Sequence, residues 1–213
     1  MNINPSAKTI LCFGDSNTWG DMPGADGRWP ADVRWPGVLQ SELGNDYEVI
    51  SEGLCGRTFG DVDLKKPYRA GISYLRPCLQ SHKPLDFVIV MLGTNDIKEE
   101  FGLSEDDIAQ YLKETLELIR EETDARVLVI CPPPIRVGGW KSAWLFRQRA
   151  LEMFKTLPGK FEEVTKKQKC LYLNAGDYIT SSAKDGFHLD SEMHKILGEV
   201  LAKRTREVLP ADA

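Results

Sequence analysis

The sequence predicts an α/β fold: a single-domain, open, parallel five-stranded sheet with helices on both faces, in three α/β/α layers. Three continuous apolar runs, at residues 9–13, 86–92 and 126–131, are typical of central parallel strands that helices cover on each side. Strand and helix patterns alternate along the chain, which indicates right-handed crossovers between parallel strands. The chain has no internal repeat or linker, so residues 1–213 are expected to form one domain.

Two weaker strand candidates, at residues 47–51 and 170–174, complete the five. Two stretches without a clear element, residues 21–32 and 56–69, are long enough to be functional, and we expect them to form walls of a binding cleft.

Two helices are predicted by apolar residues at helical spacing. The first spans residues 108–119 and follows Ser104 and Asp107, which are placed as a capping pair. The second spans residues 193–201, with Asp190 as the expected cap.

Helices are also expected at residues 35–43 and 142–157. Pro158 and Gly159 should interrupt the latter, before a second helical piece that runs to residue 167.

Composition excludes several classes of protein. A net charge of −5 argues against a nucleic-acid or anionic-membrane partner. No window approaches the roughly 20 apolar residues that a membrane-spanning helix needs. The first residues lack an apolar signal core, which predicts a cytoplasmic protein. Three histidines and five irregularly spaced cysteines form no zinc pattern, so we expect no metal, no cofactor and no disulfide.

Four polar clusters follow predicted strands: Gly14-Asp15-Ser16, the glycine at 56, Gly93-Thr94-Asn95-Asp96, and Asp185-Gly186-Phe187-His188. Because the carboxyl ends of parallel strands meet at one edge of a sheet, these clusters should converge there. An apolar strand that delivers a serine onto a tight turn is how many α/β proteins expose a hydroxyl nucleophile.

Each cluster supplies a group that a serine hydrolase needs. Ser16 is the candidate nucleophile, and His188 is the candidate base because imidazole titrates near neutrality. Asp185, three residues earlier, can fix the tautomer of the imidazole. The backbone N–H groups of Ser16 and Gly56 and the side-chain amide of Asn95 are candidate oxyanion donors.

The four blocks, in this order, resemble those of the SGNH (GDSL-type) hydrolases, and residues 10–20, 32–39 and 91–98 look most like the bacterial arylesterase/acyltransferase branch. The resemblance implies an SGNH-hydrolase/flavodoxin-like fold and hydrolysis of short acetyl or aryl esters, a small-molecule ester being the partner. Some members also transfer the acyl group to alcohols or peroxide, and some form homo-oligomers. Residue 17 is Asn instead of the Leu of the motif, which should leave the chemistry intact and alter the pocket floor.

A carbohydrate O-acetylesterase is the alternative function, and it would use the same residues on a different substrate. A thioesterase or lysophospholipase is disfavoured because the two loops contain few aliphatic residues for a long acyl chain. A non-catalytic binding module is disfavoured because both Asp185 and His188 are present.

Several other residues have both a functional and a structural interpretation. Asp15 and Asp96 are rivals of Asp185, although each is expected to hold its own loop, and Cys55 is expected to be a small packed residue. The remaining candidates are Trp19, as a substrate-binding or core residue, Trp140 and Trp144, as a pocket rim or subunit contact, and His82 and His194, as solvated surface residues.

Overall fold

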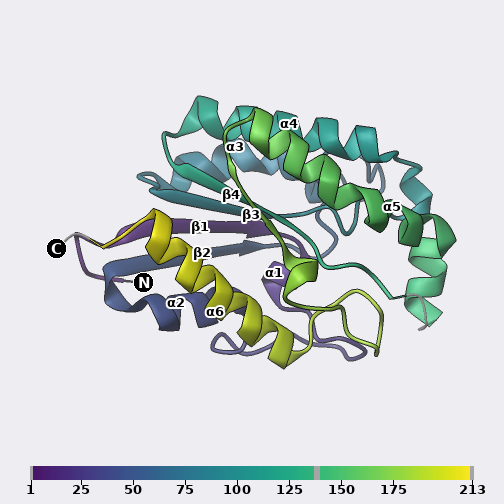
Figure 1. The fold of residues 1–213 in the computed structure, drawn as a ribbon, viewed down its shortest axis with the longest axis horizontal. Coiled ribbons are helices and arrows are strands. Elements are labelled where there is room, and N and C mark those ends of the chain that lie inside the picture. Colours follow the sequence, from purple (N-terminus) through teal and green to yellow (C-terminus); the bar gives the residue numbers. More distant parts are fainter. Residues whose placement is uncertain (1, 137–139, 212–213) are drawn as a thin grey trace.

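The five strands form one parallel sheet in the order β2-β1-β3-β4-β5 (Figure 1). The structure is a computed structural model that describes residues 2–136 and 140–211. The strands are β1 (Lys8–Gly14), β2 (Tyr47–Gly53), β3 (Phe87–Met91), β4 (Arg126–Cys131) and β5 (Leu171–Asn174). The predicted α/β class and the five-stranded parallel sheet are therefore confirmed.

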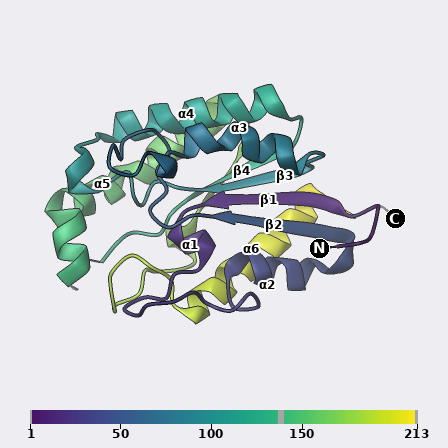
Figure 2. The same ribbon diagram turned by 180° about the vertical axis from the view of Figure 1, so that it is seen from behind.

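Helices cover both faces of the sheet (Figures 1 and 2). On one face, α2 (Trp35–Leu43) packs against α6 (Ser191–Val208). The other face carries α3 (Gly71–His82), α4 (Glu105–Glu122) and α5 (Trp140–Lys167). All five residues of β3 are buried between two hydrophobic cores, one on each side of the sheet. This double cover explains why the central strands are continuous apolar runs.

The expected helix starts are correct in position. Ser104 and Asp107 form a capping box at the start of α4, with the Ser104 N–H donating to Asp107 Oδ2 at 2.8 Å. Asp190 occupies the N-cap position of α6, but its carboxylate pairs with Lys184 Nζ at 3.1 Å and does not cap the helix.

The predicted interruption at Pro158 is wrong, because α5 runs through this residue without a break. Proline in a helix removes one backbone donor and crowds the preceding turn. Here Leu157 and Phe161, on either side, are fully buried, and the Tyr172 hydroxyl donates to the Pro158 carbonyl at 2.9 Å. Tertiary packing therefore overrides the local preference of the sequence.

Helix α3 is an element that the sequence did not predict. It contains Pro77, and its N-terminal residue is Gly71, both of which weaken a helical pattern. Its buried face consists of Leu75, Cys78 and Leu79, which join the core beneath α4.

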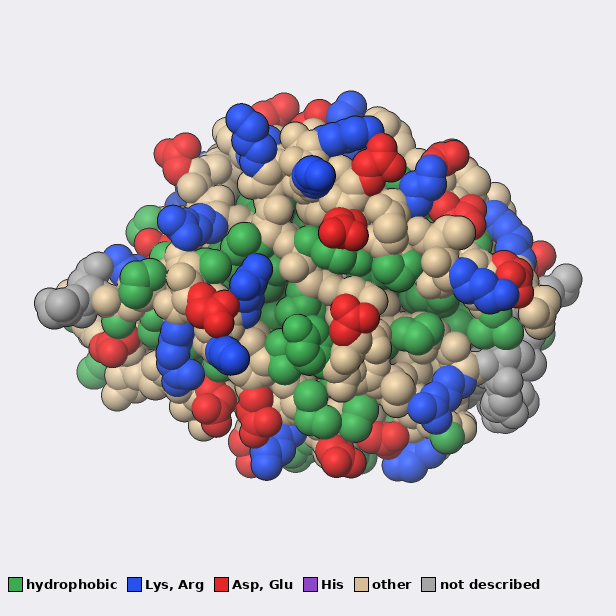
Figure 3. Space-filling view, viewed as in Figure 1, with side chains coloured by type: hydrophobic (Ala, Val, Ile, Leu, Met, Phe, Trp, Pro, Cys, Tyr) green, Lys and Arg blue, Asp and Glu red, His purple; other side chains and the backbone are tan. Residues whose placement is uncertain are grey.

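The surface shown in Figure 3 carries interspersed Lys, Arg, Asp and Glu side chains, and the residues described on this face form no continuous basic stripe. None of the helices within 2–136 and 140–211 combines the length and the apolar composition needed to cross a bilayer.

Candidate active site

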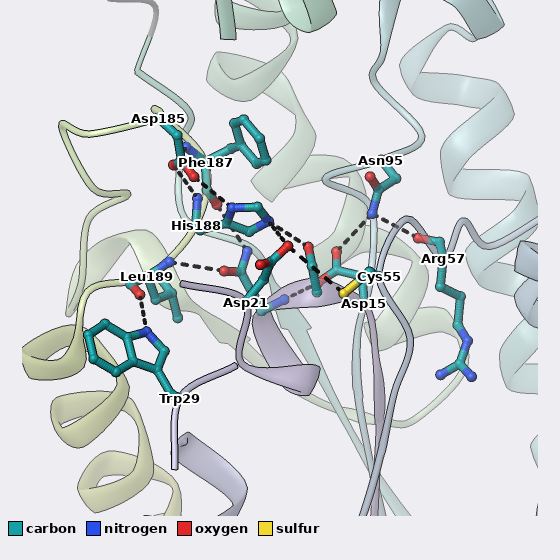
Figure 4. A network of polar contacts seen from close by, with 12 residues as sticks. Asp15, Asp21, Trp29, Cys55, Arg57, Asn95, Asp185, Phe187, His188 and Leu189 are labelled. Carbon is teal, nitrogen blue, oxygen red and sulfur yellow. Dashed lines mark hydrogen bonds and ion pairs between the residues drawn. The ribbon is translucent and has the colours of Figure 1, made fainter. Parts of the chain in front are cut away.

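A chain of hydrogen bonds joins three side chains from the two ends of the sequence (Figure 4). His188 Nε2 lies 3.0 Å from Ser16 Oγ, and His188 Nδ1 lies 2.7 Å from Asp185 Oδ2. All three residues are buried, with 6%, 8% and 4% of Ser16, His188 and Asp185 exposed. In this arrangement an imidazole can take a proton from the hydroxyl while a carboxylate holds its other nitrogen.

Ser16 begins a helix of four residues, α1 (Ser16–Trp19), at the carboxyl end of β1. Asp15 is its N-cap and accepts the N–H of Asn17 at 2.9 Å, and Gly20 ends the helix in the left-handed conformation. The turn sits directly against Gly53 at the end of β2, where a Cβ atom would lie 2.2 Å from the backbone nitrogen of Trp19. Only glycine leaves room for the serine turn at this point.

Asn17 connects the serine turn to the loop that carries His188. Its amide Nδ2 donates to the Phe187 carbonyl at 3.0 Å, and its Oδ1 accepts the Leu189 N–H at 3.1 Å. The residues on both sides of His188 are thereby fixed to the residue next to Ser16. This role was missed from the sequence, because the substitution of Leu by Asn in the motif carries no information about a partner 170 residues away.

The loop of His188 is closed by Asp185. Asp185 Oδ1 accepts the backbone N–H groups of Phe187 and His188 at 3.2 and 3.1 Å, while Oδ2 faces the imidazole. Burial acts to raise the pKa of Asp185, but its hydrogen bonds to His188 and to the backbone, together with the electrostatic interaction with His188, outweigh burial and lower the pKa below its usual value. Asp185 therefore stays ionised near neutral pH.

Of the residues expected to supply oxyanion donors, Ser16 begins α1 directly after its N-cap Asp15. Gly56 has φ +81°, a left-handed conformation that favours glycine. Asn95 Nδ2 donates to the Arg57 carbonyl at 3.1 Å and lies 3.5 Å from Asp15 Oδ2. The second of these contacts is long for a hydrogen bond, so the Asn95 amide can point that N–H at an oxyanion instead while keeping its proton.

Arg57 is a buried residue of this site that the sequence did not reveal. Its guanidinium donates to the Gly14 carbonyl at 2.8 Å and to the Glu52 carbonyl, and it stacks over the Phe13 ring at 4.2 Å. Arg57 therefore braces the end of β1, the strand that delivers Ser16.

Asp21 was also missed. Its Oδ2 lies 3.4 Å from His188 Nε2, on the side of the imidazole that faces Ser16. Cys55 Sγ lies 3.9 Å from the same oxygen, and burial, followed by the nearby Asp21 and Asp15 carboxylates, raises the pKa of the Cys55 thiol to about 12. Cys55 is thus a neutral thiol and no rival to Ser16 as a nucleophile.

The rival carboxylates Asp15 and Asp96 have other partners. Asp15 caps α1, and Asp96 Oδ1 accepts the Phe59 N–H at 2.9 Å. Burial raises the pKa of Asp15 to about 6 and that of Asp96 to about 7. The carboxylate in contact with His188 Nδ1 is that of Asp185.

The expectation that His194 is a solvated surface residue is wrong. His194 is fully buried in α6, and its Nδ1 accepts the Trp35 N–H at 3.3 Å. Burial, with smaller contributions from His188 and Arg34, lowers the pKa of His194 to about 3. Because Trp35 is the first residue of α2, this hydrogen bond joins α6 to α2 on one face of the sheet.

We expect His194 to make the folded state sensitive to mild acid. Below pH 6.5 His194 binds a proton in the unfolded chain but stays neutral in the folded chain, because its pKa in the folded state is about 3. The contribution of His194 to the free energy of unfolding therefore falls by about 2 kcal/mol between pH 7 and pH 5. His194→Asn keeps an acceptor for Trp35 and does not titrate. The unfolding free energy of wild type relative to this variant should therefore drop by that amount in urea titrations.

The comparison of two proteins isolates His194, because the raised pKa values of Asp15 and Asp96 act in the opposite direction and are common to both. A difference that stays constant from pH 7 to pH 5 would contradict the assignment.

His82 is half-buried and not a solvated surface residue. Its Nε2 is hydrogen-bonded to Glu52 Oε1 at 2.9 Å. Among the described residues, Glu52, Cys78 and His82 form a group that could hold a metal ion, since their ligand atoms all lie within 4.8 Å of one another. The group is built on β2 and α3, apart from the chain of Ser16, His188 and Asp185.

The tryptophans differ in their surroundings. Trp19 is half-buried, and the Arg28 guanidinium lies 4.8 Å from its ring centre. Trp144 is 74% exposed, whereas the side chain of Trp140 lies outside the described part of the chain.

The chain is similar to proteins of known family and structure. A model of the GDSL-like lipase/acylhydrolase family matches residues 12–196. The inhibitor-bound aryl esterase of M. smegmatis is 35% identical, with a TM-score of 0.91, over 95% of this chain and 100% of that chain. Est24, a carbohydrate acetylesterase from Sinorhizobium meliloti, is 32% identical, with a TM-score of 0.90 and the same coverage of both chains. No curated protein sequence matched. The chain therefore belongs to the GDSL-like lipase/acylhydrolase family and is a carboxylic ester hydrolase.

Proposed function

We propose that the protein hydrolyses esters of short carboxylic acids, acetyl and aryl esters among them, through an acyl-enzyme on Ser16. The observation that carries this proposal is the hydrogen-bonded chain from Ser16 Oγ through His188 to Asp185, with distances of 3.0 and 2.7 Å. Such a chain activates a hydroxyl that is otherwise a weak nucleophile.

In the proposed reaction, Ser16 Oγ attacks the ester carbonyl carbon as its proton passes to His188 Nε2. The tetrahedral intermediate then collapses, the bond to the alcohol oxygen breaks, and Nε2 returns the proton to that oxygen. Water, deprotonated by the same nitrogen, attacks the acyl-enzyme and releases the acid and free Ser16. Asp185 holds the imidazole and stabilises the imidazolium formed in both halves.

Negative charge on the carbonyl oxygen needs preorganised donors, each contributing roughly 3 kcal/mol to the lowering of the barrier. We assign this role to the backbone N–H groups of Ser16 and Gly56 and to the Asn95 amide. In support, no hydrogen bond within the described residues takes up the N–H of Ser16 or Gly56.

Labelling by an organophosphate tests the nucleophile. Diisopropyl fluorophosphate should give wild-type protein a single mass adduct that maps to Ser16 and disappears in Ser16→Ala. Ser73→Ala, which removes an exposed hydroxyl from α3, is the matched control and should be labelled like wild type. Absence of an adduct on folded wild-type protein would overturn the proposal.

A series of p-nitrophenyl esters from acetyl to octanoyl tests the acyl length, and rates are expected to fall as the chain lengthens. Running the series with an added alcohol tests transfer of the acyl group, which the aryl esterase resemblance suggests.

The small-molecule ester is the partner that the family implies, while a cytoplasmic location, a homo-oligomer and a substrate contact by Trp19 stay predictions.

A further inference from the structure

Asp21 places a second carboxylate beside the imidazole. Asp185 holds Nδ1, and Asp21 Oδ2 lies 3.4 Å from Nε2, the nitrogen that exchanges protons with Ser16 and substrate in the proposed reaction. Figure 4 shows Asp21 and Asp185 on opposite sides of the His188 ring.

The position of Asp21 is fixed by its backbone. Its N–H donates to the Ser16 carbonyl at 3.0 Å, and an isolated β-bridge joins it to Arg28. The Asp21 side chain is 28% exposed, so the carboxylate beside the imidazole is partly open to solvent.

The alcohol portion of the ester must come close to this carboxylate. Its oxygen receives a proton from His188 Nε2, which requires a separation of about 3 Å. Since Asp21 Oδ2 is 3.4 Å from the same nitrogen, that oxygen lies within about 6.5 Å of Asp21 when the bond breaks. Substituents up to about three atoms further along the alcohol can therefore reach Asp21.

We infer that Asp21 selects the alcohol portion of the substrate by charge, favouring alcohols that carry a cation or a hydroxyl donor near the ester oxygen and disfavouring anionic ones. This inference rests on the proposed ester hydrolysis. A carboxylate attracts a cationic group and accepts a hydrogen bond from a hydroxyl, whereas it repels a carboxylate or phosphate at the same distance. Because Asp21 is partly exposed, solvent weakens the effect to roughly 3- to 10-fold in kcat/KM.

Two acetate esters of the same shape test this selection. Acetylcholine carries a quaternary ammonium group where 3,3-dimethylbutyl acetate carries a neutral carbon, and the acyl group is the same in both. Wild-type protein should show a higher kcat/KM for the cationic ester, and added salt should reduce the ratio. In Asp21→Asn, which keeps the size of the side chain, the ratio should fall roughly 3- to 10-fold.

Asp26→Asn is the matched control, because it removes one negative charge from an exposed position of the same loop. It should keep the wild-type ratio. A wild-type ratio near one, or an Asp21→Asn ratio within twofold of wild type, would overturn the inference while Ser16-dependent hydrolysis continues. Loss of Ser16-dependent hydrolysis of every ester would instead overturn the proposed function, so the two failures are distinguishable.

Discussion

Replacing Asp185 by Asn should lower kcat for p-nitrophenyl acetate roughly 1,000- to 10,000-fold with little change in fold. The carbonyl oxygen of the new amide can still accept the N–H groups of Phe187 and His188, as Asp185 Oδ1 does at 3.2 and 3.1 Å. Its NH2 group would then face His188 Nδ1, which must become an acceptor. The ring proton moves to Nε2, and the imidazole can no longer take the proton of Ser16.

Asp190→Asn is the matched control, since Asp190 lies in the same segment and pairs with Lys184 outside the hydrogen-bonded chain. It should leave kcat within about twofold of wild type, because neither Asp190 nor Lys184 is hydrogen-bonded to the three reacting side chains. The loss of this exposed ion pair costs no more than about 1 kcal/mol of stability, so the variant stays folded. Circular dichroism and the melting temperature establish that both variants are folded. An Asp185→Asn enzyme that retains more than a tenth of wild-type kcat would show that another group orients His188.

The sequence predicted the parts of the site that depend on strand order. Ser16 follows β1 and Asn95 follows β3, two neighbouring parallel strands, so their convergence follows from the topology alone. The pairing of Asp185 with His188 could be predicted because His188 is only three positions further along the chain, and the two side chains meet at 2.7 Å. Local spacing and sheet topology are the two kinds of information that a single sequence carries well.

Contacts that do not follow from strand order could not be predicted. Asp21 lies in a loop whose path depends on the bridge to Arg28, and His194 was misplaced because its partner, the Trp35 N–H, belongs to another helix. The continuous helix at Pro158 has the same cause, since the packing of Leu157 and Phe161 is invisible to local propensity. In each case a tertiary contact decides the outcome.

Asn17→Leu should lower kcat roughly 10- to 100-fold with a nearly constant KM, although Leu is the residue of the family motif. Leucine can neither donate to the Phe187 carbonyl nor accept the Leu189 N–H, the two bonds that Asn17 makes at 3.0 and 3.1 Å. A buried polar group without a partner costs about 1–3 kcal/mol, so the loop should shift to reach water and carry His188 with it.

The variant Asn17→Asp distinguishes a role of Asn17 in positioning His188 from a role in packing alone. Asn17→Asp still accepts the Leu189 N–H but sets a carboxylate oxygen against the Phe187 carbonyl, so its kcat should lie between those of wild type and Asn17→Leu. The rate of organophosphate labelling of Ser16 should fall in parallel with kcat, because both depend on proton transfer to His188.

Leu116→Ala in α4 controls for lost stability, because it deletes a fully buried side chain away from the site at a cost of about 2–5 kcal/mol. It should lower the melting temperature and leave kcat of the folded enzyme at 25 °C unchanged. If Asn17→Leu behaved in the same way, Asn17 would only stabilise the fold. A fall in kcat at constant KM, partly recovered in Asn17→Asp, would instead identify Asn17 as the residue that holds the imidazole in reach of Ser16.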